Sequence, residues 1–364
     1  MSTDNSLLKP LRDEIDLIDL ELLRLLNDRA RCAIEIGRMK AEQLDDPEEL
    51  VFYRPERVAK VLGRLVIENS GPLKEKDITT LFREIMSCCL SLEQLVRVGF
   101  LGPEGTYTEA AARKQFGRFV ETQGLVSING VFREVDSGSV NYGVVPVENS
   151  TEGMVNHTLD CFVKSDLKIC AEIELPIHHC FLRSPAGKAE ITEIVSHSQS
   201  LAQCRSWLDS HYPDVPRRAV SSNAEAARLI TSDARLGAVA GEMAAEKYDL
   251  TIAASNIEDN PNNKTRFLVI GKQNADESES DKTSILVSVK NKPGALHEIL
   301  EPFRLLNIGL SRIETRPSGS GDWSYLFFID FDGHQKGKNV GEALLKVEEL
   351  ALNLKVLGSY PKAI

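Results

Sequence analysis

The sequence lacks any long apolar run, although 42% of its 364 residues are hydrophobic. No stretch approaches the roughly eighteen consecutive apolar residues that a membrane-spanning helix needs. The first residues, MSTDNSLLKPLRDEID, also lack the basic head and apolar core of a secretory signal. We therefore expect no membrane span and no secretory signal, and we expect the protein to be cytoplasmic.

Positive charge is scarce as well. Lys and Arg together number 43 against 54 Asp and Glu, which gives a formal net charge of -11. Nucleic acids and anionic lipid surfaces attract basic proteins, so we expect neither as a partner. A local basic pocket for a small acid is still compatible with this balance. The chain is long enough for two or three domains with well-buried cores.

Motifs for metals, nucleotides and a nucleophilic serine are missing. The seven cysteines form no C-x-x-C and the seven histidines are scattered, so we expect reduced core thiols, no metal and no cofactor. The segment Gly102–Thr106 has neither the lysine of a P-loop nor the spacing of a dinucleotide fingerprint. Ser196 is not part of a G-x-S-x-G motif, which argues against a serine hydrolase.

The pattern of apolar residues divides the chain into three segments. Residues 7–95 show helical periodicity, with a loop at 43–52, a second helix opened by Pro55 and a third from Asp77. From Val96, short β runs alternate with helical stretches, which predicts α/β units around largely parallel sheets. A polar run at 272–282 reads as a linker, and the order strand, helix, strand, strand, helix, strand beyond it fits a ferredoxin-like domain. The predicted domains are 1–95, 96–272 and 283–364.

Arg29 occupies a position in the first helix where the pattern calls for a hydrocarbon. From Leu11 to Ile36, the apolar positions recur at alternating spacings of four and three residues, as in a helix that packs on other helices. Arginine stays charged, so burying it unpaired would cost several kcal/mol. The seam must therefore meet an anion at Arg29, either a carboxylate of a partner helix or a bound ligand.

Three further cations could join Arg29. Lys40 follows three turns later on the same face, roughly 16 Å along the axis, and Arg12 and Arg57 could complete a cationic box around a small dicarboxylic acid. Solvated helix surface explains Arg12 and Lys40 equally well.

Four stretches of this segment form a set: Leu11–Asp16, the Arg29 position, Gly37–Lys40 and Tyr53–Arg57. They resemble the helical chorismate mutase domain of bifunctional phenylalanine-pathway enzymes. The resemblance implies an intertwined homodimer in which Arg29, Arg57 and the partner subunit's Arg12 hold the carboxylates of chorismate. It also implies that Lys40 donates to the ether oxygen. The rearrangement is unimolecular, so it needs positioned cations and donors and no nucleophile.

Two positions depart from that family's usual pattern. Val58 stands where a glutamate usually holds the substrate's ring hydroxyl, although Val58 also fits an apolar stripe with Val61, Leu62 and Leu65. Because a lost hydrogen bond costs about 1–3 kcal/mol, we predict a slow or weakly binding mutase. Val58→Glu should raise kcat/KM, and an unchanged value in a folded variant would contradict this.

The second departure is Glu93, which aligns where many members carry a glutamine that donates to the ether oxygen. A carboxylate donates only when it is protonated. We therefore predict mutase activity that falls as the pH rises, and a flat profile across neutrality would argue against a donor role for Glu93.

Four blocks follow one another in the middle segment: Gly102–Thr108, Val145–Gly153, Ser196–Gln199 and Asn262–Phe267. Their order is similar to that of prephenate dehydratase. The resemblance implies two α/β lobes with a cleft between them, as in periplasmic binding proteins, with the chain crossing near residue 175 and returning near 250.

That resemblance also assigns site residues. Prephenate loses CO2 and water, so the reaction needs a proton donor to the ring hydroxyl and an anchor for the pyruvyl carboxylate. The resemblance makes Thr265 the donor or relay and Arg266 the anchor. Around the hydroxyl and ring it implies Glu148, Asn149, Ser196 and Gln203.

The last segment contains Asn291–Leu296, between a strand and a helix, and Glu314–Pro317, at the end of the next strand. Both resemble the amino-acid-binding ACT domain of the same enzymes, which binds L-phenylalanine between two copies and inhibits the dehydratase. The implied effector residues are Gly294, Ala295, Leu296, Glu314, Thr315, Arg316 and Pro317.

The combined interpretation is a mutase–dehydratase under end-product inhibition. One alternative keeps the dehydratase but gives the helical segment only a role in dimerisation. Another is a non-catalytic amino-acid sensor, against which Glu148, Asn149, Thr265 and Arg266 speak. Separate assays with chorismate and prephenate distinguish these three.

Overall fold

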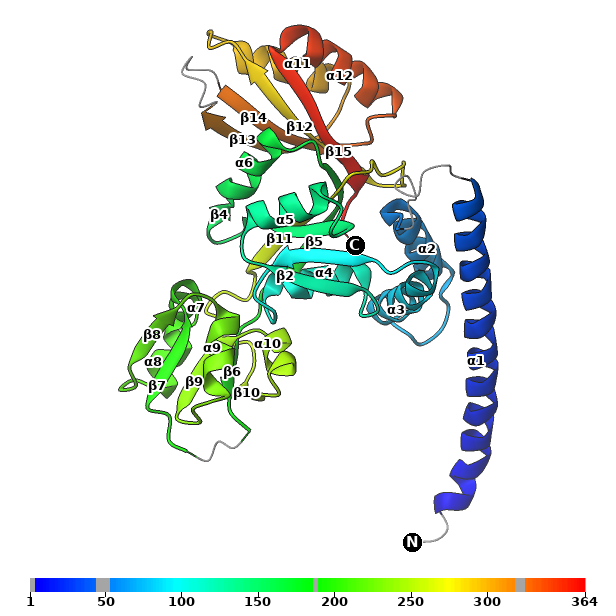
Figure 1. The fold of residues 1–364 in the computed structure, drawn as a ribbon, viewed down its shortest axis with the longest axis vertical. Coiled ribbons are helices and arrows are strands. Elements are labelled where there is room, and N and C mark those ends of the chain that lie inside the picture. The colour runs from blue at the N-terminus through cyan, green and yellow to red at the C-terminus, as the bar shows by residue number, and fades with distance from the viewer. Residues whose placement is uncertain (1–3, 44–52, 186–188, 318–324, 364) are drawn as a thin grey trace. The chain divides into compact units, whose positions relative to one another are not determined.

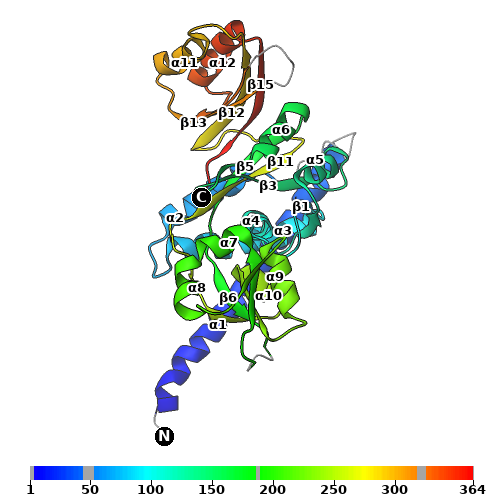
Figure 2. The same ribbon diagram turned by 90° about the vertical axis from the view of Figure 1, so that its left-hand side faces the viewer.

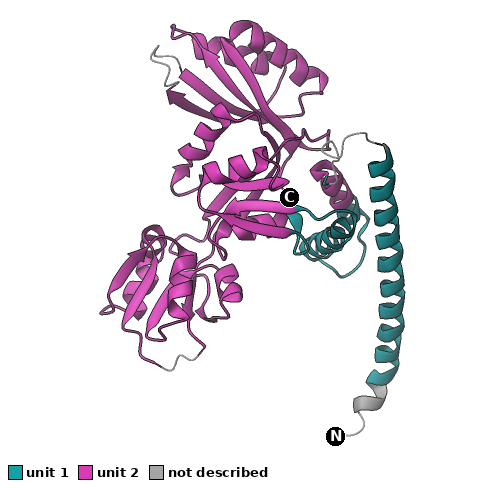
Figure 3. Cartoon of the chain, viewed as in Figure 1, with its two compact units in different colours: residues 1–53, 64–96, 116–120 teal, residues 54–63, 97–115, 121–364 magenta. Residues whose placement is uncertain are grey.

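The computed structural model describes residues 4–43, 53–185, 189–317 and 325–363. These residues form two compact units (Figure 3), one of residues 1–53, 64–96 and 116–120 and the other of residues 54–63, 97–115 and 121–364. The second helix, α2 (Pro55–Glu68), begins at Pro55 as predicted and contributes to both units. Most of the predicted loop at 43–52 lies outside the described residues.

The first unit is built on α1 (Asp4–Gln43) and α3 (Glu75–Glu93). The two helices pack together around Gly37, where an added Cβ would lie 3.3 Å from the Cβ of Glu93. The predicted heptad seam does lie on one long helix. In the single chain, however, the seam is uncovered: Leu11 is 58% exposed and Leu22 51%. The expectation that the cysteines lie in cores is wrong for Cys32 of this seam, which is exposed, whereas all seven thiols are free.

The second unit contains three sheets (Figure 1), of which the first has six strands. Its order is β2-β1-β3-β11-β5, with β4 paired to β3. Strands β1, β2 and β3 are parallel, whereas β11 runs antiparallel to both of its neighbours. The strands are β1 (Arg97–Leu101), β2 (Glu121–Leu125), β3 (Tyr142–Asn149), β4 (Gly153–Met154), β5 (Lys168–Pro176) and β11 (Lys264–Gly271). The helices beside them are α4 (Tyr107–Phe116), α5 (Ile128–Asp136) and α6 (Asn156–Lys164).

The second sheet has the order β10-β6-β9-β7-β8 and forms the second lobe. Its strands are β6 (Cys180–Arg183), β7 (Glu193–His197), β8 (Arg217–Val220), β9 (Leu236–Ala240) and β10 (Thr251–Ala254). Its helices are α7 (Ser198–Gln203), α8 (Arg205–His211), α9 (Asn223–Ile230) and α10 (Glu242–Lys247).

The predicted pair of α/β lobes is confirmed, with two corrections. Each sheet is mixed, because the strands next to the crossings between lobes pair antiparallel to their neighbours. The outward crossing lies between β5 and β6, close to the predicted residue 175. The return lies later than the predicted residue 250, because β10 still pairs in the second lobe and the chain re-enters the first sheet only at Lys264.

The third sheet has the predicted ferredoxin-like order of elements and the strand order β13-β14-β12-β15. Its strands are β12 (Asp281–Val289), β13 (Leu310–Pro317), β14 (Tyr325–Asp332) and β15 (Asn353–Pro361). Helices α11 (Ala295–Leu305) and α12 (Lys338–Leu350) lie side by side and cover one face of it (Figure 2). The predicted linker is irregular from 272 to 280, after which β12 begins.

The other face of the third sheet packs on the first lobe. Leu286, Phe328, Leu357 and Tyr360 share one apolar core with residues of the first sheet and of α5 and α6. At Gly358 the two backbones approach so closely that an added Cβ would collide with the carbonyl oxygen of Ile169. The third sheet and the first lobe are therefore held together by a continuous core.

Candidate functional sites

The first unit brings together two of the predicted mutase residues. Lys40 Nζ lies 3.6 Å from Glu93 Oε2, with the two side chains 31% and 14% exposed. The close approach at Gly37, one turn before Lys40, sets this distance. Glycine at this position thus places an ammonium group beside the carboxylate that was predicted to face the ether oxygen.

The other mutase candidates lie on α1 and α2. Arg12 and Arg29 lie on α1 and are exposed in the single chain; Arg29 belongs to the uncovered seam, whereas Arg12 is rotated by about 100° from it around the helix. Arg57 is exposed and Val58 half-buried on the first turn of α2, and both belong to the second unit. Their roles stay predictions.

In the first lobe, Thr265 and Asn149 form the centre of a polar cluster. They are paired in the antiparallel register of β11 and β3. The Asn149 amide donates to the buried Thr265 hydroxyl oxygen at 2.8 Å, which leaves the hydroxyl hydrogen available to a ligand. Asn149 is itself oriented because its carbonyl oxygen accepts from the backbone amides of Thr151 and Glu152 at 2.9 and 3.1 Å.

Asn263 joins this cluster, and we assigned it no role from the sequence. It is buried, and its side-chain oxygen accepts from Asn149 at 3.1 Å and from the hydroxyls of Ser150 and Thr151, both at 3.2 Å. Its amide reaches Gln203 of the second lobe at 3.5 Å. Asn263 therefore links the two lobes at the cluster. Asn263 lies in the sequence block Asn262–Phe267, so its membership of that block could have marked it as a site residue.

In the second lobe, Gln203 is positioned by a histidine that the sequence analysis missed. His179 Nε2 lies 2.9 Å from the Gln203 side-chain oxygen, and His179 Nδ1 lies 2.8 Å from the hydroxyl of Tyr107. Burial lowers the pKa of His179, which favours the neutral ring. Nε2 then donates to the Gln203 oxygen, and Nδ1 faces the Tyr107 hydroxyl, whose hydrogen also has the His178 carbonyl as an acceptor at 2.8 Å. The Gln203 Nε2 atom is buried and has no hydrogen-bond partner among the described residues, so it can donate to a ligand.

Ser196 has its hydrogen-bond partners within the second lobe. Its fully buried hydroxyl contacts the Val239 carbonyl at 2.6 Å and Asn223 at 2.9 Å. The structure therefore groups Thr265 with Asn149, Asn263 and Gln203, and Ser196 with the core of the second lobe. Its substrate role stays a prediction.

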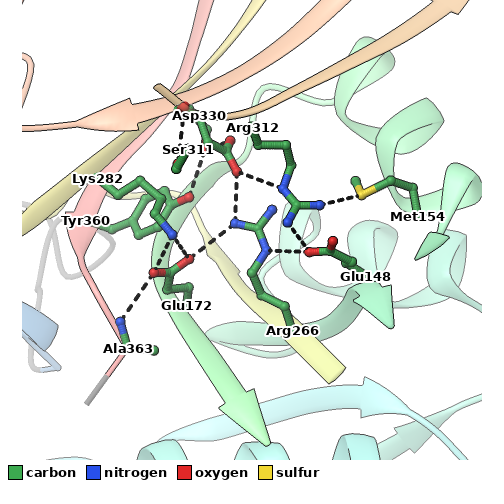
Figure 4. Close-up of polar contacts among 11 residues, drawn as sticks. Glu148, Met154, Glu172, Arg266, Lys282, Ser311, Arg312, Asp330, Tyr360 and Ala363 are labelled. Carbon is green, nitrogen blue, oxygen red and sulfur yellow. Dashed lines mark hydrogen bonds and ion pairs between the residues drawn. The ribbon is translucent and has the colours of Figure 1, made fainter. Parts of the chain in front are cut away.

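Arg266 and Glu148 face the other side of the same two strands. Each directly neighbours a cluster residue, and successive side chains on a strand point to opposite faces. Arg266 lies 2.9 Å from Asp330 of β14 and 3.2 Å from Glu172 of β5 (Figure 4). Burial disfavours its charge, but the neighbouring carboxylates outweigh this and raise the pKa of Arg266. The structure thus does not bring these two predicted substrate residues to Thr265.

The effector residues fall into two groups. Gly294, Ala295 and Leu296 line a cavity of about 200 Å³ at the start of α11. Glu314, Thr315, Arg316 and Pro317 lie on β13, an edge strand, and none of them lines that cavity. Arg316 instead pairs with Asp160 of α6 at 2.8 Å.

The described ranges contain neither a metal-binding cluster nor a membrane-spanning helix. Within them, no group of three or more His, Cys, Asp and Glu side chains is arranged to hold a metal ion. Nor does the described chain contain a helix with the length and hydropathy to cross a membrane.

Comparison with known proteins covers all three segments. The chorismate mutase type II family matches residues 11–94, prephenate dehydratase residues 98–275 and the ACT domain residues 283–349. The bifunctional chorismate mutase/prephenate dehydratase of Pseudomonas aeruginosa is 56% identical over 362 residues, 99% of each chain. That of Stutzerimonas stutzeri is 55% identical over 358 residues, 98% of each chain.

A solved structure agrees with the second and third segments. Prephenate dehydratase from Arthrobacter aurescens, solved in complex with L-Phe, is 34% identical with a TM-score of 0.68 and covers 74% of this chain and 90% of its own. The chain belongs to the family of bifunctional chorismate mutase/prephenate dehydratases.

Proposed function

We propose that this protein converts chorismate to prephenate and prephenate to phenylpyruvate, and that L-phenylalanine inhibits the second step. The observation that carries the proposal is the full-length match, at 56% identity, to an enzyme named for both activities. The mutase match over residues 11–94 favours two activities over a dehydratase with a purely dimerising helical segment.

The mutase reaction is served by charge and position alone. Arg29, Arg57 and the partner subunit's Arg12 would hold the two carboxylates of chorismate. Lys40 and a protonated Glu93 would donate to the ether oxygen as the C–O bond breaks. The Lys40–Glu93 distance of 3.6 Å supports a shared target for the two groups.

A homodimer follows from the same segment. The apolar seam of α1 is about half exposed in one chain, which is costly for so many leucines and isoleucines. A second copy of the helix would cover the seam and place the partner's Arg12 in the site that contains Arg29.

In the dehydratase reaction, the C–C bond to the ring carboxylate breaks, CO2 leaves and its electron pair enters the ring as the hydroxyl departs. The hydroxyl needs one proton to leave as water. Thr265 has a hydroxyl hydrogen to offer, because its oxygen already accepts from Asn149. A threonine is a weak acid, so it acts as a hydrogen-bond donor or relay. Gln203 can donate to the same substrate through its unpaired Nε2 atom.

The test is to follow the consumption of chorismate and of prephenate separately by the purified full-length protein, with and without millimolar L-phenylalanine. We expect both substrates to be consumed and only prephenate turnover to be inhibited. Turnover of prephenate alone would support the dehydratase with a dimerising helical segment. Binding of phenylalanine without either turnover would support the sensor.

A further inference from the structure

The two strands that carry the dehydratase cluster also carry, one residue away, the contacts with the ACT domain. On β11, Thr265 faces the dehydratase cluster and Arg266 faces the ACT sheet. On β3, Asn149 likewise faces the dehydratase cluster and Glu148 faces the ACT sheet. A shift of either strand would therefore change both sides together, because neighbouring residues share one rigid stretch of backbone.

The side toward the ACT domain is an ion-pair cluster of six residues (Figure 4). The first lobe supplies Glu148, Glu172 and Arg266, and the ACT sheet supplies Lys282, Arg312 and Asp330. Arg266, Asp330 and Glu172 are nearly inaccessible, with side chains 9%, 9% and 2% exposed. Three cations face three carboxylates, so the cluster is balanced.

This balance decides against a ligand site. A cavity of about 410 Å³ lies here, lined among others by Glu148, Arg266, Lys282 and Arg312. The cations of the cluster already have carboxylate partners, and Lys264, which also lines the cavity, lies 3.7 Å from Glu174, so each described cation of the lining is paired. The cluster is better explained as a joint between the two domains.

Further hydrogen bonds and ion pairs fix the joint. Within the ACT sheet, Ser284 donates to Asp330 at 2.6 Å and contacts the buried Tyr360 hydroxyl at 2.7 Å. Across the joint, Lys282 of the ACT sheet lies 2.7 Å from Glu172 of β5. Removing one member of such a buried set leaves the others charged and unpaired, which is strongly unfavourable. The position of β11 therefore depends on the position of the ACT sheet.

Arg312 connects this joint to the effector segment. It lies on β13, opposite Asp330 of β14, pairs with Glu148, and lies 3.8 Å from Asp330. Its guanidinium also contacts Met154 of β4 at 2.9 Å. The predicted effector residues begin two positions later on the same strand, at Glu314, and Arg316 contacts α6 of the same lobe. A ligand that moves β13 would move the partner of Glu148.

We propose that the ion-pair cluster of Glu148, Arg266, Arg312 and Asp330 couples the ACT domain to the dehydratase site by setting the positions of Asn149 and Thr265. This rests on the proposed function, and it makes Arg266 and Glu148 positioning residues. Coupling of this kind typically changes the apparent affinity of one site by roughly 5–150-fold.

The experiment compares full-length wild type with Arg312→Met, which keeps the apolar stem and removes the charge. Phenylalanine binding is measured by calorimetry, and dehydratase kcat and KM are measured across phenylalanine concentrations. We expect Arg312→Met to bind phenylalanine within about threefold of wild type, to need about tenfold more of it for half-inhibition, and to lose kcat with little change in KM. Mutase activity, unchanged, reports that the chain is folded.

Two further variants make the result specific. Arg312→Lys keeps the charge and should retain most of the inhibition seen in wild type. This comparison with wild type does not need a folded Arg312→Met. Arg304→Met removes an exposed arginine of α11 that pairs with Glu301 one turn away, and it should behave as wild type.

The outcomes separate the two proposals. Wild type without dehydratase turnover or without inhibition would overturn the proposed function. Wild type that is inhibited, together with an Arg312→Met that is inhibited equally, would overturn the coupling alone. If Arg312→Met does not fold, Asp330→Asn decides instead: a weakened response of this variant to phenylalanine would support the coupling, and inhibition like that of wild type would overturn it.

Discussion

Thr265 and Arg266 are adjacent in sequence and face different surroundings. The first accepts a hydrogen bond from Asn149, and the second is enclosed by carboxylates of two domains. The residue types alone suggested one site for both. Strand alternation separates them and gives Arg266 a role in holding the strand that carries Thr265.

Thr265→Ala should lower dehydratase kcat by about 100-fold or more, because a positioned proton donor typically contributes that much. Mutase activity should be unchanged, since Thr265 lies in the other unit. Thr265→Ser, which keeps the hydroxyl, is the matched control and should retain much of the activity. Full dehydratase turnover in the alanine variant would refute the assignment.

His179 makes the second lobe sensitive to acid. Burial lowers its pKa in the folded protein, whereas the unfolded chain binds the proton near the ordinary value of about 6.5. Below that pH the unfolded state binds more protons, so stability is lost as the pH falls. His179→Gln should therefore lose less thermal stability than wild type between about pH 7 and about pH 5.

Differential scanning calorimetry at both pH values measures this effect. His157→Gln changes an exposed histidine of α6 and should show the wild-type loss. If His179→Gln loses as much stability as wild type over this range, the neutral state of His179 is not what acid disrupts.

At the scale of the element, α1 forms as a long helix as predicted, but its apolar seam is not covered within the single chain. Its seam was read from spacing alone, and the helix forms, but its leucines are half exposed in one chain. Burial of each such side chain is worth about 1.5–3 kcal/mol, so covering the seam would favour the proposed homodimer.

Leu22→Glu places a carboxylate on the seam and should dissociate the dimer and abolish mutase activity, because the site would lose the partner's arginine. Sedimentation velocity and a chorismate assay measure both effects. Arg31→Glu places the same group on the opposite side of α1, where Arg31 is 73% exposed, and should leave the assembly intact. A Leu22→Glu variant that stays dimeric would show that the seam is not the interface.

At the scale of the whole molecule, the first-lobe sheet and the ACT sheet share one apolar core and one ion-pair cluster, whereas the second lobe has cores of its own. The order of elements in each sheet was predicted. The packing of the ACT sheet on the first lobe was not, because its apolar residues on both faces read equally well as the core of an isolated domain.

Gly358 tests that packing. A methyl group there would collide with the Ile169 backbone, so Gly358→Ala should cost about 1–3 kcal/mol of stability, as other overpacking substitutions do. For a unit of this size, this lowers the melting temperature of the dehydratase–ACT transition by several degrees. Gly63→Ala, in α2 with open space around the added Cβ, is the control. An unchanged melting temperature for Gly358→Ala would argue that the two domains separate easily.

The sequence by itself determined what local spacing and residue identity can determine: the helical segment, the two α/β lobes, the order of the ACT elements, and the blocks that contain Thr265 and Asn149. Periodicity reports which face of an element is buried, and motifs report which residue types recur together. Neither reports which distant element a side chain meets.

Only the tertiary structure decided the partners. The polar cluster around Thr265 also includes Asn263, His179 and Tyr107, whose contacts are with residues 24 to 114 positions away in the sequence. Arg266 is not part of that cluster and contacts carboxylates 94 and 64 positions away. Such contacts depend on how sheets stack and on which side of a strand faces which domain. A shift of one residue along β11 exchanges the two sides, and the chain's own pattern of residue types does not distinguish them.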